Sequence, residues 1–495
     1  REIGVYAEVI DGVAKAPPEG FEFFGIVLSG GPDSVLDTDS RQLPGWVLEQ
    51  DVPILGICYG FQLLVKLLGG SLRAGTKREY GNTTINVNQD LVGKDVNLFA
   101  GQPSQQTVWM SHGDDAELAP GFHAIAHTGD GVIAAVAHGD KPYFGLQYHP
   151  EVHHTEWGSQ LLENFCREIC RSAINWRRAD MLAAASHQVE TMVGGQDQVL
   201  VACSGGVDST VTAALCAHAL GGERVTAVFC DTGLLRKDEV AWVAENLREL
   251  GLSHIEVLDK KAMFFERLAG VTDPEEKRKI IGRSFIEAFE EFATGHKNEF
   301  AFLGQGTLYP DVIESAGHGS GAKVIKSHHN VGGLPETLKL PLLEPFRMMF
   351  KDEVRAIGEQ LGLPRKLVHR HPFPGPGLAV RILGEVTPEA VVTLQEADHI
   401  FIQGLRDEGL YDKVWQAFAV LLPVKSVGVM GDNRTYQSTI ALRAVAATDG
   451  MTAEASDLPM DFLCRMANTI VRQVHGVNRV VYDITGKPPA TIEWE

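Results

Sequence analysis

Cysteine is scarce in this sequence, and its spacing argues against one common kind of site. The 495 residues include seven cysteines, and no two of them form a Cys-x-x-Cys pair. Structural zinc sites usually draw on such closely spaced pairs, so the sequence predicts no metal of that kind. A low, odd cysteine count is typical of a reducing compartment, so we expect free thiols and a cytoplasmic protein.

Long apolar runs and an excess of positive charge are also missing. The longest apolar runs, such as Val52–Ile57, are far shorter than the roughly 20 apolar residues that cross a bilayer. Acidic residues outnumber basic ones by 64 to 44, which gives a formal net charge of −20. Because proteins that grip nucleic acid usually present a basic face, we expect neither a membrane nor a nucleic acid as a partner.

Two stretches of the chain alternate short apolar runs with helical patterns. In the first, the expected strands are Gly25–Leu28, Val52–Ile57, Thr83–Val87 and Gly131–Ala137, and the expected helices are Phe61–Leu68 and Leu161–Arg171. In the second, the expected strands are Val199–Cys203, Val225–Phe229, His254–Leu258 and Phe300–Leu303, and the expected helices are Asp208–Leu220, Lys237–Leu250 and Glu275–Ala293. This alternation predicts an α/β protein with two doubly wound domains whose sheets are largely parallel.

A proline-rich segment divides the second stretch from the rest of the chain. His371–Leu378 (HPFPGPGL) contains three prolines and two glycines, so it can continue neither a helix nor a central strand. We interpret it as the boundary of a smaller C-terminal α+β domain. The predicted domains cover residues 1–174, 175–370 and 371–495.

One cysteine lies in a pattern that suits a nucleophile. Gly56–Gly60 (GICYG) lies between an expected strand and an expected helix, and its glycines flank Cys58. A sharp strand-to-helix turn exposes the central side chain, and the helix N-terminus favours a thiolate. The alternative is a buried cysteine that packs as a small apolar side chain.

Two further segments could complete a site around Cys58. His149 and Glu151 follow an apolar run at a spacing of two, so both can face the same side and act as base and orienting acceptor. Ser29–Pro32 (SGGP) follows an expected strand and could expose backbone N–H groups as an oxyanion hole. Taken singly, a solvated loop and a plain turn are the alternatives.

A glycine-rich loop opens the second stretch. The loop residues are Ser204, Gly205, Gly206, Val207, Asp208 and Ser209. Consecutive backbone N–H groups and the start of a helix make a cradle for phosphates, and Asp208 could hold a Mg²⁺ ion that bridges them. The loop does not have the Gly-x-x-x-x-Gly-Lys pattern of a Walker A motif.

Over roughly residues 1–172, the chain resembles the class I glutamine amidotransferase family. Three segments carry this resemblance: SGGP, GICYG and the segment with His149 and Glu151. The resemblance implies that Cys58 attacks the side-chain amide of glutamine, that His149 moves the proton and that Glu151 orients it. It implies an oxyanion hole formed by the amides of Gly31 and Tyr59. The family also has a further strand upstream, which we expect to precede Arg1.

The loop SGGVDS resembles that of the N-type ATP pyrophosphatases. The resemblance implies cleavage of ATP between the α- and β-phosphates, with pyrophosphate held by the loop and Mg²⁺ as the cofactor. Asp231 follows the next expected strand, and the resemblance makes it a contact on the adenosine side.

Longer motifs extend the resemblance to nearly the whole chain. YPDVIES, IKSHHNVGGLP, HPFPGPGL and KPPATIEWE, in this order, resemble the glutamine-hydrolysing GMP synthetase family. The resemblance implies an ATP lid that includes Asp311, Glu314, Lys326, His328 and His329. It also implies a homodimer through the C-terminal domain and an XMP site there, for which the candidates are Arg479, Lys487, Ile492 and Glu493.

The sequence therefore predicts a ligase that uses ATP, XMP and glutamine. XMP would be adenylylated at O2 with release of pyrophosphate, and ammonia from glutamine would then displace AMP at C2 to give GMP. Two alternatives stay open at this point. One is a related ligase with another small acid or a tRNA as acceptor, and the other is a non-catalytic nucleotide-sensing or scaffold protein.

Overall fold

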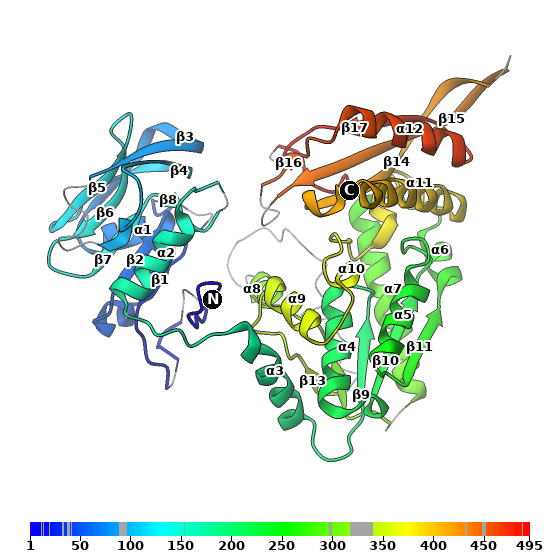
Figure 1. The fold of residues 1–495 in the computed structure, drawn as a ribbon, viewed down its shortest axis with the longest axis horizontal. Helices are drawn as coiled ribbons and strands as arrows, with labels where there is room; N and C mark the ends of the chain where they lie inside the picture. Colours follow the sequence, from blue (N-terminus) through cyan, green and yellow to red (C-terminus); the bar gives the residue numbers. More distant parts are fainter. Residues whose placement is uncertain are drawn as a thin grey trace. The chain divides into compact units, whose positions relative to one another are not determined.

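The computed structural model forms two compact units, Arg1–Arg177 and Arg178–Glu495 (Figure 1). It describes all residues except 11, 13, 19, 32–33, 37–39, 41, 89–96, 153, 297–298, 317–339, 431–432, 448–451 and 488. All seven cysteines are free thiols. Among the described helices, none combines the length and the apolar character needed to cross a bilayer.

The first unit is built on an eight-stranded sheet in the order β1-β2-β7-β6-β5-β3-β4-β8. The pairs β1–β2 and β2–β7 are parallel, and the sheet continues from β7 as antiparallel pairs. The strands are β1 (Ile26–Leu28), β2 (Ile54–Ile57), β3 (Ser71–Val87), β4 (Gln105–Glu117), β5 (Phe122–Thr128), β6 (Ile133–His138), β7 (Tyr143–Leu146) and β8 (Tyr148–His149). The helical elements are η1 (Gly45–Gln50), α1 (Tyr59–Leu67), η2 (Asn97–Phe99), α2 (Gly158–Asn164) and η3 (Phe165–Ile169).

Strand β2 is buried on both faces, as its continuous apolar run predicts. Ile54 belongs to a core with Phe61 and Leu64 of α1, whereas Leu55 belongs to a second core with Leu161 of α2. Adjacent strand residues point to opposite faces, so the two helices cover opposite sides of the sheet. The expected helix Leu161–Arg171 is found as α2 followed by η3, a π-helical turn.

The second unit contains a five-stranded sheet in the order β11-β10-β9-β12-β13, and all its pairs are parallel. Its strands are β9 (Val199–Cys203), β10 (Val225–Asp231), β11 (His254–Asp259), β12 (Phe302–Gly304) and β13 (Leu342–Leu343). The associated helices are α3 (Arg178–Met192), α4 (Val207–Leu220), η4 (Gly222–Arg224), α5 (Glu239–Glu249), α6 (Lys261–Leu268), α7 (Pro274–Gly295), α8 (Tyr309–Ala316), α9 (Lys351–Gln360) and α10 (Arg365–Val368).

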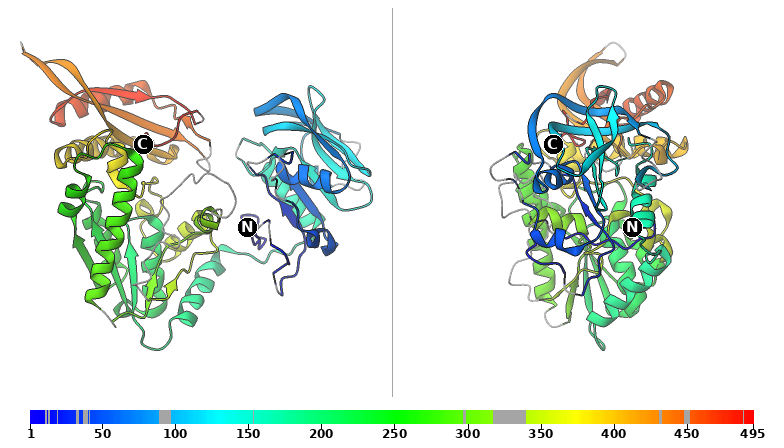
Figure 2. Two further views of the ribbon diagram at one scale, coloured as in Figure 1. Left: turned by 180° about the vertical axis from the view of Figure 1, so that it is seen from behind. Right: turned by 90° about the vertical axis from the view of Figure 1, so that its left-hand side faces the viewer.

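A second, four-stranded sheet closes the chain. Its strands are β14 (Gln416–Met430), β15 (Asn433–Ala446), β16 (Glu454–Ala455) and β17 (Val477–Asp483), and its helices are η6 (Gly377–Arg381), α11 (Pro388–Asp407), η7 (Tyr411–Lys413) and α12 (Met460–Gln473). Strands β14 and β15 form a long hairpin that projects from this sheet (Figures 1 and 2). The α/β class with sheets that contain parallel strands is thus confirmed.

One hydrophobic core runs through both parts of the second unit. It includes Leu234 and Phe264 near the five-stranded sheet, and Phe401, Ile440 and Phe462 near the four-stranded one. The segment HPFPGPGL is embedded in this unit, because Leu378 is fully buried and its N–H donates to the carbonyl of Leu234 at 2.7 Å. The division of the chain at residues 174 and 370 stays a prediction.

Candidate active sites

Cys58 occupies a strained turn between β2 and α1. Its φ of 48° and ψ of −106° are rare for a residue with a side chain, so the surrounding structure must enforce them. Both flanking glycines sit where no larger residue fits. A Cβ atom on Gly56 would lie 2.6 Å from Cα of Phe61, and one on Gly60 would lie 2.2 Å from the carbonyl oxygen of Leu28.

The structure brings Cys58, His149 and Glu151 together. Nδ1 of His149 lies 2.7 Å from Oε1 of Glu151. Burial lowers the pKa of the His149 imidazole, but hydrogen bonds to Cys58 and Glu151 outweigh it and raise the pKa to about 10. The His149 imidazole is therefore protonated at neutral pH, and its hydrogen bond to Cys58 places it beside the nucleophile.

Neighbouring residues fix the backbone of His149. His149 pairs with Trp109 across β8 and β4, and the Thr155 hydroxyl donates to the His149 carbonyl oxygen at 2.6 Å. Because both backbone and side chain have fixed partners, the imidazole is held in one orientation.

The expected oxyanion loop lies beside this triad. A Cβ atom on Gly30 would lie 2.9 Å from Cε1 of His149, and one on Gly31 would lie 3.4 Å from Cδ1 of Tyr59. The loop after β1 and the start of α1 are therefore in contact at the site. Gly31 and Tyr59 thus lie next to each other, and an oxyanion hole formed by their amides stays a prediction.

Two partners of Cys58 were not anticipated from the sequence. The Cys58 thiol lies 3.6 Å from the carbonyl oxygen of Ser111, and Nε2 of Gln147 lies 3.9 Å from its sulfur. The signal for Gln147 was present, since an amide stands between the apolar run of β7 and His149. Its side chain is buried and accepts a hydrogen bond from Gln62 at 3.4 Å.

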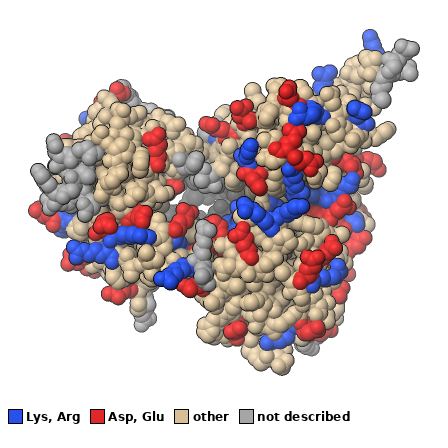
Figure 3. All heavy atoms as spheres, viewed as in Figure 1, with Lys and Arg blue, Asp and Glu red and all other residues tan. Residues whose placement is uncertain are grey.

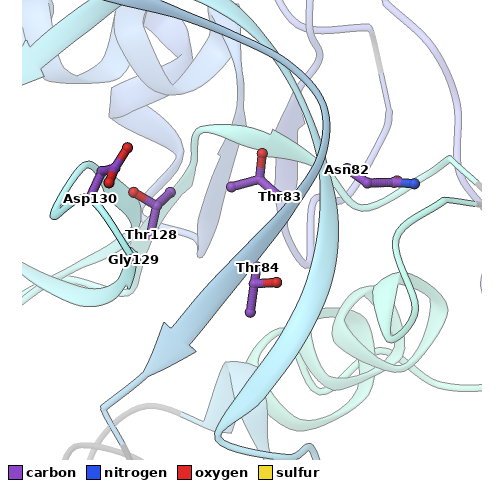
Figure 4. Close-up of a pocket in the computed structure, with 6 residues that line it drawn as sticks. All are labelled: Asn82, Thr83, Thr84, Thr128, Gly129 and Asp130. Carbon is purple, nitrogen blue, oxygen red and sulfur yellow. The ribbon is translucent and has the colours of Figure 1, made fainter.

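A hollow elsewhere in the first unit shares no residue with the triad. Its volume is about 330 Å³, and it is lined by Asn82, Thr83, Thr84, Thr128, Gly129 and Asp130 (Figure 4). It offers hydroxyl groups and one carboxylate, but no nucleophile with an adjacent base.

In the second unit, the loop between β9 and α4, which we expect to hold phosphates, has a conformation fixed by its own residues. Gly205 has a φ of +82°, and Gly206 is the N-cap of α4. The hydroxyl of Ser204 accepts from the N–H of Gly206 at 3.3 Å, and that of Thr210 donates to the Gly206 carbonyl at 2.8 Å. Ser209 donates to the same carbonyl at 3.2 Å, so the hydroxyl groups fix the loop.

Asp208 lies in the first turn of α4, which follows β9, and Asp231 is the last residue of the neighbouring parallel strand β10. Oδ2 of Asp208 lies 3.6 Å from Nζ of Lys351, a contact that the sequence did not reveal. Oδ1 of Asp208 is buried and has no hydrogen-bond partner in the described part of the chain. Asp231 accepts from the N–H of Gly233 at 3.0 Å and forms an ion pair with Lys261 at 2.9 Å, which raises the pKa of that lysine.

A buried ion pair lies close to Gly205 of this phosphate loop. Arg370 donates to Glu239 at 2.7 Å, and both side chains are 7% exposed. A Cβ atom on Gly205 would lie 3.8 Å from Glu239. Neither residue lies in a motif that singles it out in the sequence.

The expected lid is only partly within the described residues. Asp311 lies in the first turn of α8, where its carboxylate accepts from the N–H of Leu308 at 2.9 Å. Glu314 is on the same helix. Lys326, His328 and His329 lie outside the described residues.

The expected XMP residues lie around the four-stranded sheet. Arg479 is exposed on β17, and the backbone of Lys487 pairs with that of Ala453. Ile492 is buried. Glu493 forms two hydrogen bonds with the guanidinium of Arg381, at 2.8 and 3.0 Å.

The fold and the family models define a class of protein, a glutamine amidotransferase unit joined to an α/β unit with a glycine-rich loop between β9 and α4. Family models match in the same order: glutamine amidotransferase class-I over residues 1–169, NAD synthase over 174–272, and GMP synthase C terminal domain over 403–494. The chain belongs to the family of glutamine-hydrolysing GMP synthases.

Full-length relatives show this membership. A GMP synthase (glutamine-hydrolyzing) of Thermosipho africanus is 51% identical over 502 residues, which cover 100% of this chain and 96% of the relative. Those of Aquifex aeolicus and Thermomicrobium roseum are 51% and 53% identical over 503 and 478 residues. The alignments cover 100% and 95% of this chain, and 96% and 88% of the two relatives. The chain is thus a ligase of glutamine-dependent GMP synthesis.

Proposed function

We propose that Cys58, His149 and Glu151 release ammonia from glutamine. Cys58 attacks the side-chain amide, His149 passes a proton to the departing ammonia, and Glu151 keeps the imidazole oriented. The amides of Gly31 and Tyr59 stabilise the oxyanion. The observation that carries this assignment is the 2.7 Å contact between His149 and Glu151, beside a cysteine held at positive φ.

In the second unit, the loop Ser204–Ser209 would hold the β- and γ-phosphates of ATP. Its amides and the N-terminus of α4 suit anions. Lys351 adds a positive charge near Asp208. Asp231 lies at the carboxyl end of β10, where α/β sheets bind nucleotides, and we assign it to the adenosine side.

The residues present fit a magnesium ion at this loop. The buried Oδ1 of Asp208, without a hydrogen-bond partner in the described residues, is a suitable hard ligand. No group of three His, Cys, Asp or Glu in the described part of the chain could hold a metal by itself. With a single carboxylate at the loop, the nucleotide phosphates would supply the other ligands of Mg²⁺. The bound ion would offset the charge of the triphosphate.

The other substrate, XMP, would bind where the chain ends at the four-stranded sheet. Arg479 and Lys487 suit a nucleotide phosphate, Ile492 offers an apolar contact, and Glu493 can accept a hydrogen bond from a purine N–H. Figure 3 shows a group of Lys and Arg side chains on one face of the second unit, which favours anionic substrates there. Asp311, Glu314, Lys326, His328 and His329 remain the proposed lid over ATP.

We propose that the reaction begins with the adenylylation of XMP. O2 of XMP attacks the α-phosphorus of ATP, and pyrophosphate leaves. Ammonia from the Cys58 site then attacks C2, and AMP leaves with the former O2 of XMP.

The C-terminal sheet would also carry a homodimer contact. Val429 and Tyr436 on the β14–β15 hairpin are 75% and 64% exposed, and Ile484 after β17 is 76% exposed. Apolar side chains this exposed on a projecting hairpin (Figure 2) favour burial against a second copy. Seven free thiols agree with a reducing, cytoplasmic setting.

An isotope experiment tests the adenylylation step. XMP labelled with ¹⁸O at O2 is converted with ATP and glutamine, and AMP is analysed by mass spectrometry. We expect the label in the phosphate of AMP. Label that appears in water or in pyrophosphate would contradict attack by O2 on the α-phosphorus.

A further inference from the structure

Three fully buried cations hold the last five residues of this chain, Thr491–Glu495. Arg443 on β15, Arg381 in η6 and Lys277 on α7 each have side chains with no exposed area. Buried charges are costly unless they are paired and hydrogen-bonded, so each position needs a defined partner. The partners of all three include groups of this tail.

Each cation contacts a different part of the tail. Arg443 donates to the carbonyl oxygens of Thr491 and Ile492, at 2.9 and 2.7 Å. Arg381 holds the carboxylate of Glu493 through two nitrogens. Lys277 donates to the carboxylate of Glu495 at 2.5 Å.

Lys277 also fixes the segment that carries Arg381. Its ammonium group donates to the carbonyl oxygens of Ala379 and Ile382, at 3.2 and 2.7 Å. These residues lie on either side of Arg381. The three donors of one lysine thus tie together the tail and the backbone that presents Arg381 to it.

The contacts of Glu493 leave it little freedom as an acceptor. Oε1 accepts from Arg381 at 2.8 Å and from Gln416 at 2.8 Å, and Oε2 accepts from Arg381 at 3.0 Å. A carboxylate has about four acceptor positions, so the contacts within the described part of the chain take three and leave one on Oε2. The remaining position has a fixed direction and suits a single N–H donor of a ligand.

We infer that Lys277 and Arg381 are positioning residues for XMP, which set the direction of the free acceptor on Glu493. Arg381 acts directly on Glu493, and Lys277 acts through Arg381 and Glu495. Lys277 lies on α7, a helix of the ATP-binding part, and outside the residues matched by the family models. The inference rests on the proposed role of the tail in binding XMP.

The test compares Michaelis constants for XMP and ATP in the ammonia-dependent reaction of the full chain. We expect Arg381→Lys to raise the KM for XMP about tenfold, because an ammonium cannot replace a two-nitrogen contact, with the KM for ATP changed less than about twofold. We expect the same direction, with a smaller effect, for Lys277→Met and for Glu495→Gln. The last variant keeps its shape and a hydrogen bond, so it folds even where Lys277→Met does not.

A double variant and a control separate positioning from mere stability. Arg381→Lys with Glu495→Gln should raise the KM for XMP little beyond Arg381→Lys alone, since both act through Glu493. Arg465→Met removes an exposed contact between one guanidinium nitrogen and both carboxylate oxygens of Glu408, and it should leave both constants unchanged. A purely structural role would lower the melting temperature of the tail variants and leave the KM for XMP as it was.

The variant Glu493→Ala distinguishes the two possible failures. If it leaves the KM for XMP unchanged, the proposed role of the tail is wrong. If it raises this KM while Arg381→Lys and Glu495→Gln do not, the role of the tail stands and the positioning inference is overturned.

Discussion

Glu151 holds the imidazole of His149 through a contact of 2.7 Å between Oε1 and Nδ1. The two residues lie two positions apart, so the pairing is local and depends only on the conformation after β8. Together with Cys58, this contact raises the pKa of His149 to about 10 although burial acts against it. The folded site therefore favours a protonated histidine at neutral pH.

The raised pKa predicts how stability depends on pH. Because the folded pKa exceeds the ordinary value of about 6.5, protonation of His149 stabilises the fold fully below pH 6.5. This contribution is lost as the pH rises from 6.5 towards 10. Glu151→Gln should thus destabilise the first unit on the order of 1 kcal/mol at pH 6, a modest value because Glu151 is half exposed, and much less at pH 10. Denaturant unfolding at both pH values measures this, and an equal loss at both would contradict it.

Removal of the nucleophile should separate the two nitrogen sources. Cys58→Ala should abolish GMP formation from glutamine and retain the rate with added ammonium at raised pH, because ATP and XMP bind in the second unit. Cys166→Ala, which removes another thiol of the first unit, is the control and should keep both activities. Loss of both activities in a folded Cys58→Ala protein would refute two separate sites.

The phosphate loop should matter for either nitrogen source. Asp208→Asn should slow AMP formation about 100-fold with glutamine and with ammonium, the loss typical of removing one electrostatic contact at a reacting centre. Asp197→Asn changes an exposed carboxylate just before β9 and should have no effect. A defect of Asp208→Asn confined to the glutamine-dependent reaction would show that the assignment is wrong.

The turn at Cys58 should not tolerate a methyl group on Gly60. Gly60→Ala should cost about 1–3 kcal/mol, because the new atom would lie 2.2 Å from the carbonyl oxygen of Leu28. Gly282→Ala, in the exposed middle of α7 with open space around it, should instead stabilise by about 0.5–1 kcal/mol. Thermal unfolding of both variants measures the contrast, and similar melting temperatures would count against the close packing of this turn.

Local signals explain why much of this architecture could be predicted from the sequence. The apolar runs of β2 and β9 and the glycines around Cys58 and Ser204 depend on short-range geometry, which sequence periodicity encodes. The nearness of His149 to Glu151 follows from a spacing of two along one strand end. Motif resemblance then supplied the order of the domains.

Contacts between distant segments could not be predicted in this way. Nothing in the sequence around Lys351 indicates that its side chain contacts Asp208. Lys277 likewise looks in the sequence like an ordinary exposed lysine on a polar helix. Its burial depends on the tail that returns from the far end of the chain to cover it. Such pairings are set by tertiary packing, for which a single sequence has no periodic signal.

The proposed division of chemistry between the two units is tested most directly by following nitrogen and phosphate in one reaction. The full chain is supplied with XMP, ATP and glutamine labelled with ¹⁵N at its side-chain amide, and the products are analysed by mass spectrometry. We expect ¹⁵N in the 2-amino group of GMP, with AMP and pyrophosphate formed in equal amounts. Unlabelled GMP, or ADP and phosphate in place of AMP and pyrophosphate, would contradict this division.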